Sequence, residues 1–221
     1  MSGLACFRRD TRGASAAEFA LVLPAVLLML FGIIDAGRYA WTLNQIEKAV
    51  QMGTRYAVVT QIVPDGLNTA NFAGLSCGSY NVATGKAICR EALGTISCTK
   101  PTNTVTCSCT QTALGAGSCP TLGTPNSSAF TNIVSRMQVF APYLSAKDVT
   151  VKYSGSGIGF AGDPSTSTND DTKQLADVAP IVTVEVGNMQ LDAIMLFGGN
   201  VSLPRFSYSL TLEDGDGAVG Y

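Results

Sequence analysis

The clearest hydrophobic pattern along the chain lies near its amino terminus. Residues 19–34 are sixteen consecutive positions without a charge, and the uncharged stretch counted from Ala14 is interrupted only by Glu18. A helix rises about 1.5 Å per residue, so roughly 20 apolar residues are enough to cross the hydrocarbon layer of a bilayer. The pattern therefore predicts one transmembrane helix over residues 14–36.

The flanks of this segment indicate its orientation. Basic residues precede it and aromatic residues follow it: Arg8, Arg9 and Arg12 on one side, Tyr39 and Trp41 on the other. Basic residues favour the cytoplasmic side of a membrane, and aromatic residues gather at its interfaces. We therefore expect a single pass, with residues 1–13 in the cytoplasm and the rest of the chain on the opposite side.

The next segment changes to helical spacing. Apolar or small residues recur three and four positions apart, at Leu43, Ile46, Val50, Gly53 and Ala57. This spacing predicts an amphipathic extension over residues 37–62, with one face on the core of its own domain. Together the two segments make one helix of about 45 residues, on the order of 70 Å long. We expect it to be kinked or interrupted near Pro24 and to end before Pro64.

The carboxyl-terminal part, residues 128–221, combines one helix with alternating strands. Asn126 can cap a helix whose apolar face is Phe130, Ile133, Met137, Phe140 and Leu144. Apolar residues then alternate with polar ones in three runs: Val149, Val151 and Tyr153; Val182, Val184 and Val186; Phe206, Tyr208, Leu210 and Leu212. A period of two predicts an antiparallel sheet with one wet face. The apolar run 194–197 favours a turn of core helix, with contact to a membrane surface as the alternative.

The segment between these parts, residues 63–127, is a cysteine-rich region that we expect to be loop. It is rich in Gly, Ser, Thr and Asn and holds six of the seven cysteines: Cys77, Cys89, Cys98, Cys107, Cys109 and Cys119. Outside the cytoplasm such cysteines form disulfides. Six cysteines allow 15 pairings. A bond between Cys107 and Cys109 would close a strained small ring, and excluding it leaves about 12 pairings open. The fold class that results is α+β.

Composition narrows the chemistry further. The chain has no histidine, which removes the common His-dependent nucleophile systems and His-ligated metals. A net charge of −2 gives no basic face for nucleic acid. The stretch from Gly157 to Gly162 matches G-x-G-x-x-G, but Asp163-Pro164 follows where a dinucleotide site needs a helix. The acidic pairs at 170–171 and 214–216 lack EF-hand spacing. We expect no metal, no cofactor and no enzyme activity.

Three ordinary interpretations of the amino terminus compete with a more specific one. A secretory signal needs a cleavage site after the apolar run, and only a weak one lies near Ala36. A lipoprotein signal would need an apolar stretch before Cys6, and a plain signal anchor does not account for Glu18. A carboxylate near the start of a membrane helix is costly and points to function. The sequence R-G-A-S-A-A-E-F, from Arg12 to Phe19, resembles the cleavage signature of type IV prepilins.

The residues that follow resemble the TadE-like subgroup of these proteins. Residues 18–38, E-F-A-L-V-L-P-A-V-L-L-M-L-F-G-I-I-D-A-G-R, share with that subgroup a proline inside the apolar run and an exit of the form F-G-I-I-acid-x-G-R. The matching positions are Pro24, Phe31, Gly32, Asp35, Gly37 and Arg38. The resemblance covers about residues 9–60 and implies cleavage by a prepilin peptidase after Gly13, which would leave Ala14 as the new amino terminus and Glu18 as the assembly residue.

The resemblance also implies a function, a location and partners. It implies a non-catalytic minor pseudopilin of a Tad/Flp-type adhesive pilus, with a small pilin-like head in the periplasm and one pass through the bacterial inner membrane. The expected partners are the prepilin peptidase, other pilin-like subunits, the inner-membrane pilus platform and the lipid bilayer. The alternative is a signal-anchored periplasmic binding or enzymatic domain unrelated to pili.

Overall fold

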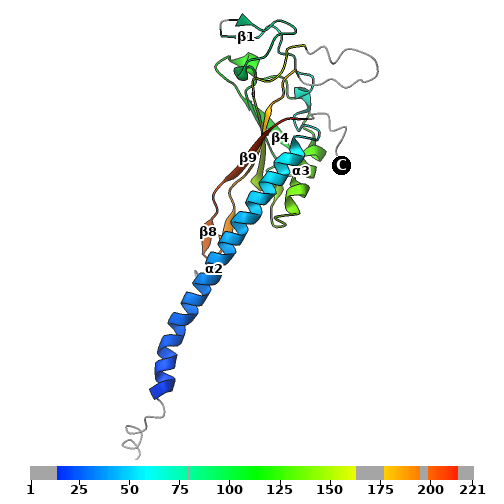
Figure 1. The fold of residues 1–221 in the computed structure, drawn as a ribbon. Coiled ribbons are helices and arrows are strands. Elements are labelled where there is room, and N and C mark those ends of the chain that lie inside the picture. Colours follow the sequence, from blue (N-terminus) through cyan, green and yellow to red (C-terminus); the bar gives the residue numbers. More distant parts are fainter. Residues whose placement is uncertain (1–13, 79, 163–176, 195–198, 214–221) are drawn as a thin grey trace, which may run out of the picture. The chain divides into compact units, whose positions relative to one another are not determined.

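The computed structural model describes residues 14–78, 80–162, 177–194 and 199–213 of this chain (Figure 1). The chain divides into two compact units. The first contains residues up to Thr42 together with Gln190–Ser202, and the second contains Leu43–Met189 and the residues from Leu203 onward. The leader residues 1–13, including Gly13 and Cys6, lie outside the described residues.

One helix belongs to both units. Helix α2 runs from Ala14 to Ala57, 44 residues, and continues without interruption through Pro24 (Figure 1). Of the two expected alternatives, the interruption is therefore wrong, and the kink stays a prediction. A proline removes one backbone hydrogen bond and crowds the preceding turn. The residues of the long apolar stretches on both sides of Pro24 still form the other backbone hydrogen bonds of the helix. The helix ends at Ala57, five residues before the expected end of the extension at residue 62.

The main sheet lies in the second unit and has five antiparallel strands in the order β4-β3-β5-β6-β9. The expected alternating runs form β5 (Val149–Ser154), β6 (Ile181–Val186) and β9 (Phe206–Thr211). Val149, Val151 and Tyr153 are buried, and so are their partners across the register in β6. The other face carries polar side chains, among them a salt bridge of Lys152 with Glu185. The one-sided sheet is as predicted.

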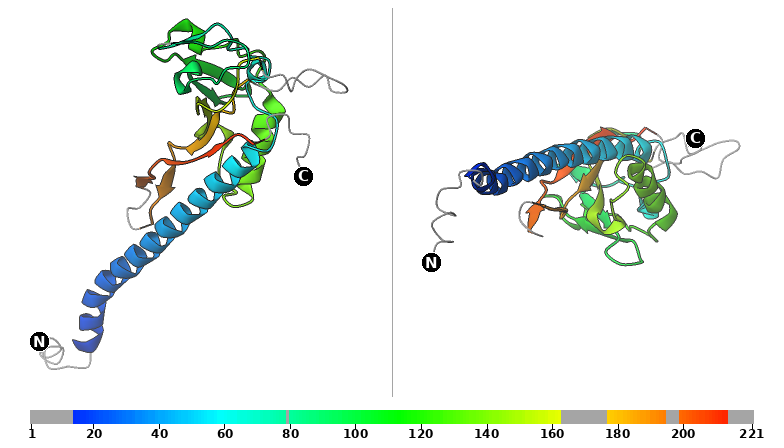
Figure 2. Two further views of the ribbon diagram at one scale, coloured as in Figure 1. Left: turned by 45° about the horizontal axis from the view of Figure 1, so that its top comes forward. Right: turned by 90° about the horizontal axis from the view of Figure 1, so that it is seen from below.

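Two helices supply the other side of this core. Helix α3 spans Ser127–Gln138, and the Asn126 side chain accepts a hydrogen bond from the Ala129 N–H at 2.9 Å, which is the predicted cap. It lies beside residues 43–57 of α2 (Figures 1 and 2). A Cβ on Gly53 would stand 2.5 Å from the Met137 Cγ, so only glycine permits this close approach. The Thr54 hydroxyl donates to the Tyr208 carbonyl at 3.1 Å and joins α2 to β9.

The cysteine-rich segment contributes more structure than the expected loop. Strands β3 (Thr95–Thr99) and β4 (Thr106–Thr110) lie within it and complete the main sheet. A small hairpin, β1 (Ser76–Cys77) with β2 (Tyr80–Asn81), precedes them. Short 3-10 turns occur at Asp65–Leu67, Arg90–Ala92, Ala116–Ser118 and Ala146–Asp148. The α+β class is confirmed, but the main sheet contains strands from before residue 128 as well as from after it.

Three disulfides hold this segment. The bonds join Cys77 to Cys89, Cys98 to Cys107 and Cys109 to Cys119. Cys98 and Cys107 face each other in the register of β3 and β4, with Cα atoms 4.1 Å apart. Cys98 is fully buried, so this bond lies in the core and replaces apolar side chains that the segment lacks.

A second small hairpin belongs to the first unit. Strands β7 (Gln190–Asp192) and β8 (Asn200–Ser202) pair antiparallel, with Leu191 opposite Val201. Of the run 194–197, for which a turn of core helix is expected, only Ile194 belongs to the described residues, and it is 45% exposed. Residues 195–197 lie outside the described residues, so the expectation for the run stays a prediction.

Candidate functional site: the amino-terminal helix and its hairpin

The amino-terminal half of α2 exposes its apolar side chains. Leu21 is 81% exposed and Met29 70%, values typical of surface lysines and not of leucine or methionine. The exposed apolar residues extend from Phe19 to Ile34 around the whole helix. The helix is long and apolar enough to cross a membrane, and none of its most apolar window is buried. An apolar helix surface of this length requires lipid or partner helices to cover it.

Glu18 is the one acid that precedes this surface in α2. The helix begins at Ala14, the residue directly after Gly13, so Glu18 lies just beyond the first turn. Its side chain is exposed, next to the exposed Phe19. A carboxylate in this position benefits from the positive end of the helix dipole, yet it would lose that benefit and its hydration inside hydrocarbon unless a cation meets it.

At the other end of the apolar surface, two charged side chains attach the hairpin to the helix. The Asp35 carboxylate accepts a hydrogen bond from the Ile194 N–H at 3.0 Å. Arg38 donates to the same carboxylate at 3.3 Å and to the Asp192 carbonyl at 3.2 Å. The Asp35 side chain is 14% exposed and that of Arg38 42%. Both residues match the TadE-like pattern in the sequence. Their partners in the hairpin lie 154 and 159 positions further along the chain, and the sequence pattern does not indicate these contacts.

Helix and hairpin also enclose an apolar pocket. Its lining comes from α2 at Ala36 and Tyr39 and from the hairpin at Leu191, Ala193 and Val201. Asp35 borders it. Ala193 is buried, whereas Val201 is 36% exposed and Trp41, beyond the pocket on α2, is 67% exposed. Apart from the Asp35 carboxylate and the Tyr39 hydroxyl the lining is apolar, which suits hydrocarbon better than a polar ligand.

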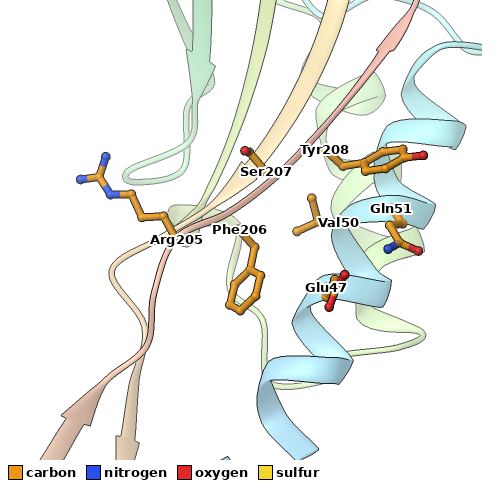
Figure 3. A pocket seen from close by; sticks show the side chains of 7 residues that line it. All are labelled: Glu47, Val50, Gln51, Arg205, Phe206, Ser207 and Tyr208. Atoms are coloured by element: carbon orange, nitrogen blue, oxygen red, sulfur yellow. The ribbon is translucent and has the colours of Figure 1, made fainter. Parts of the chain in front are cut away.

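A separate groove lies within the second unit, between α2 and β9. Glu47, Val50 and Gln51 line it from the helix, and Arg205, Phe206, Ser207 and Tyr208 from the strand (Figure 3). Phe206 and Tyr208 turn toward the helix, and Arg205 points away from it (Figure 3). Arg205 lies 3.5 Å from Glu185, which also binds Lys152.

The remaining candidates for chemistry stay apart from these sites. The stretch Gly157–Gly162 is a loop in which Gly159 bridges to Val178, and the residues directly after it, 163–176, lie outside the described residues. Across the described ranges, no three acidic, histidine or cysteine side chains gather as a metal site. The acidic pairs at 170–171 and 214–216 lie outside those ranges.

Comparison with known proteins identifies the amino-terminal helix. Residues 13–55 match the model of a family described as TadE-like protein. The match begins at Gly13 and includes Glu18, Asp35 and Arg38, so it confirms the resemblance found in the sequence for this part of the chain. No curated protein and no solved structure matches the chain.

Proposed function

We propose that this chain is a non-catalytic minor pseudopilin that takes part in assembly of a Tad/Flp-type pilus at the bacterial inner membrane, after cleavage by a prepilin peptidase. One observation carries the proposal. An exposed apolar helix begins at Ala14, places Glu18 just beyond its first turn, and lies within the stretch that matches the TadE-like family. A helix exposed on all sides suits first a bilayer and then a bundle of like helices.

The peptidase step follows from the position of Gly13. Cleavage on the cytoplasmic side after Gly13 would remove the arginines of residues 1–13 and create a free amine on Ala14. The helix would stay in the membrane, with the head in the periplasm. The three disulfides support that location, because such bonds persist in oxidising compartments.

Assembly then depends on the pairing of charges between subunits. In a bundle of helices, the Glu18 carboxylate of one subunit would meet the Ala14 amine of a neighbour. Each charge alone is costly to bury, and the pair offsets that cost only when both members are present. The pairing would therefore align neighbouring pilin-like subunits along their helices and disfavour other registers.

Substitution of Glu18 tests this role. Insertion needs no carboxylate, so Glu18→Ala should reach normal membrane levels and be cleaved normally or nearly so. Loss of one member of a buried charge pair costs about 3–5 kcal/mol. The variant should therefore assemble poorly and co-purify poorly with other pilin-like subunits. Glu18→Asp, one methylene shorter, should fall between the two.

Glu47→Ala is the matched control, because Glu47 is an exposed carboxylate on the same helix outside the apolar run. It should leave piliation intact. Membrane abundance, cleavage and surface piliation are measured in the same strains. Full piliation by Glu18→Ala would show that the carboxylate is incidental and would favour the alternative, a signal-anchored periplasmic domain.

A further inference from the structure

The β7–β8 hairpin is held at the point where the apolar run of α2 ends. Asp35 follows directly after Ile34, the last residue of that run. Its carboxylate binds the Ile194 N–H, and Arg38, one turn further, binds the Asp192 carbonyl. One helical turn rises about 5.4 Å. If the predicted transmembrane segment 14–36 crosses the bilayer, these two contacts near its end place the hairpin at the level of the membrane surface.

The hairpin carries exposed apolar side chains at this level. Ile194 is 45% exposed and Val201 36%, and on the helix Ile33 and Ile34, which directly precede Asp35 in the chain, are 63% and 42% exposed. The wholly aliphatic part of the pocket between helix and hairpin continues the same surface. Exposure of these apolar side chains to water is unfavourable, and an exposed apolar patch of this kind indicates a binding surface.

From these contacts we infer that the β7–β8 hairpin is a membrane-surface element, in which Ile194 and Val201 contact the boundary between lipid headgroups and acyl chains. The inference rests on the proposed membrane span of α2 and adds a second contact with the same bilayer. Lipid is favoured over a second copy of the chain because the patch is continuous with the apolar surface of the helix. The polar residues Gln190, Asp192 and Asn200 are exposed on the same hairpin and suit the headgroup layer.

The inferred contact would fix the depth of the helix. Because Asp35 and Arg38 attach the hairpin to α2, movement of the helix along its axis would drag Ile194 and Val201 out of the interface or into hydrocarbon. The hairpin therefore acts as a stop that holds the exit of the span at Asp35 until the subunit leaves the membrane.

Tryptophan fluorescence can test the contact, since the chain has a single tryptophan. In a Trp41→Phe background, one tryptophan is introduced at a time by Ile194→Trp, Val201→Trp, Phe31→Trp or Ile158→Trp. Each full chain is reconstituted in vesicles of phosphatidylethanolamine and phosphatidylglycerol doped with phosphatidylcholine brominated either near the headgroup or deep in the acyl chain. Phe31→Trp reports the span. Ile158→Trp is the matched control, since Ile158 is 56% exposed and lies in the other unit.

The inference predicts that Ile194→Trp and Val201→Trp lose fluorescence mainly to the shallow bromines, that Phe31→Trp loses it to the deep ones, and that Ile158→Trp is little affected. If Phe31→Trp is quenched while both hairpin variants are quenched no more than Ile158→Trp, the hairpin inference is overturned and the span stands. If Phe31→Trp is not quenched, the span itself fails and the inference fails with it. Hairpin emission that responds only to protein concentration would assign the patch to a second copy and would also overturn it.

Discussion

Replacement of Asp35 by alanine should release the β7–β8 hairpin from α2 without unfolding the head. The Asp35 carboxylate accepts from the Ile194 N–H at 3.0 Å and from Arg38 at 3.3 Å. Arg38 in turn donates to the Asp192 carbonyl. Asp35→Ala therefore removes one attachment of the hairpin. The second attachment, the hydrogen bond from Arg38, remains, but the Arg38 guanidinium loses the carboxylate that orients it.

The size of the effect follows from these contacts. A hydrogen bond to a charged group contributes about 1.5–3 kcal/mol, and a partly exposed ion pair about 0–1 kcal/mol. Because Arg38 is 42% exposed, solvent reduces the total. We expect a local loss of roughly 1–2 kcal/mol, equivalent to a roughly 5- to 30-fold rise in the open population of the hairpin.

Hydrogen–deuterium exchange of the full chain in detergent micelles measures this opening at the Ile194 amide. Asp35→Ala should accelerate that amide by the stated factor, and Asp35→Asn, which keeps an oxygen acceptor, should accelerate it less. Gln190→Ala is the control, since it removes an exposed hydrogen bond on the same hairpin, which the Gln190 side chain accepts from the Asn200 side chain at 3.1 Å. An Ile194 amide that exchanges at the wild-type rate in Asp35→Ala, or a head that accelerates equally throughout, would refute the reasoning.

Two further predictions concern the head. Intact-mass analysis under oxidising conditions should find no unpaired thiol among the six cysteines of residues 77–119. Each bridge joins cysteines 9 to 12 positions apart and should contribute roughly 2–4 kcal/mol; two or more unpaired thiols would count against this. Tyr153→Phe should cost about 1–3 kcal/mol, because the Val63 N–H would lose its 3.0 Å acceptor in the core. Burial raises the pKa of the Tyr153 hydroxyl well above its ordinary value. Above about pH 10 the unfolded chain therefore loses a proton that the folded chain keeps, and the free energy of unfolding falls by about 1.4 kcal/mol per pH unit. Denaturant titrations at several pH values should show a smaller decline in Tyr153→Phe than in wild type, and parallel curves would contradict this.

The sequence was sufficient for the elements with strong periodicity. The apolar run and the spacing of Ile46, Val50 and Ala57 predicted α2, and alternation predicted β5, β6 and β9. The Asn126 cap was also predicted, because its signal is local. In the helix and in these strands, apolar side chains recur at the helical or strand period, so their spacing indicates the buried face.

Strands β3 and β4 escaped prediction for a physical reason. The fully buried positions of β3 are Ile96 and Cys98, and its other residues are Thr and Ser. The core contact that fixes β4 beside it is the disulfide to Cys107, which hydrophobic alternation cannot register. The Cys98–Cys107 pairing follows from that strand register, which spacing alone does not provide.

The hairpin site was hidden for another reason. Strands β7 and β8 have three residues each, too few to establish a period. The contacts of Asp35 and Arg38 join residues more than 150 positions apart, and no local sequence pattern indicates such contacts. What the sequence did provide was the acid and the arginine at the exit of the apolar run.

The measurement that tests the proposed function most directly is the amino-terminal residue of the protein isolated from membranes, with and without the prepilin peptidase. The proposal predicts a chain that begins at Ala14 when the peptidase is present and a chain that retains residues 1–13 when it is absent. Gly13→Leu should retain those residues in either strain and should fail to support piliation. A mature chain that begins near Ala36, or a Gly13→Leu variant of unchanged size that supports normal piliation, would contradict the pseudopilin assignment.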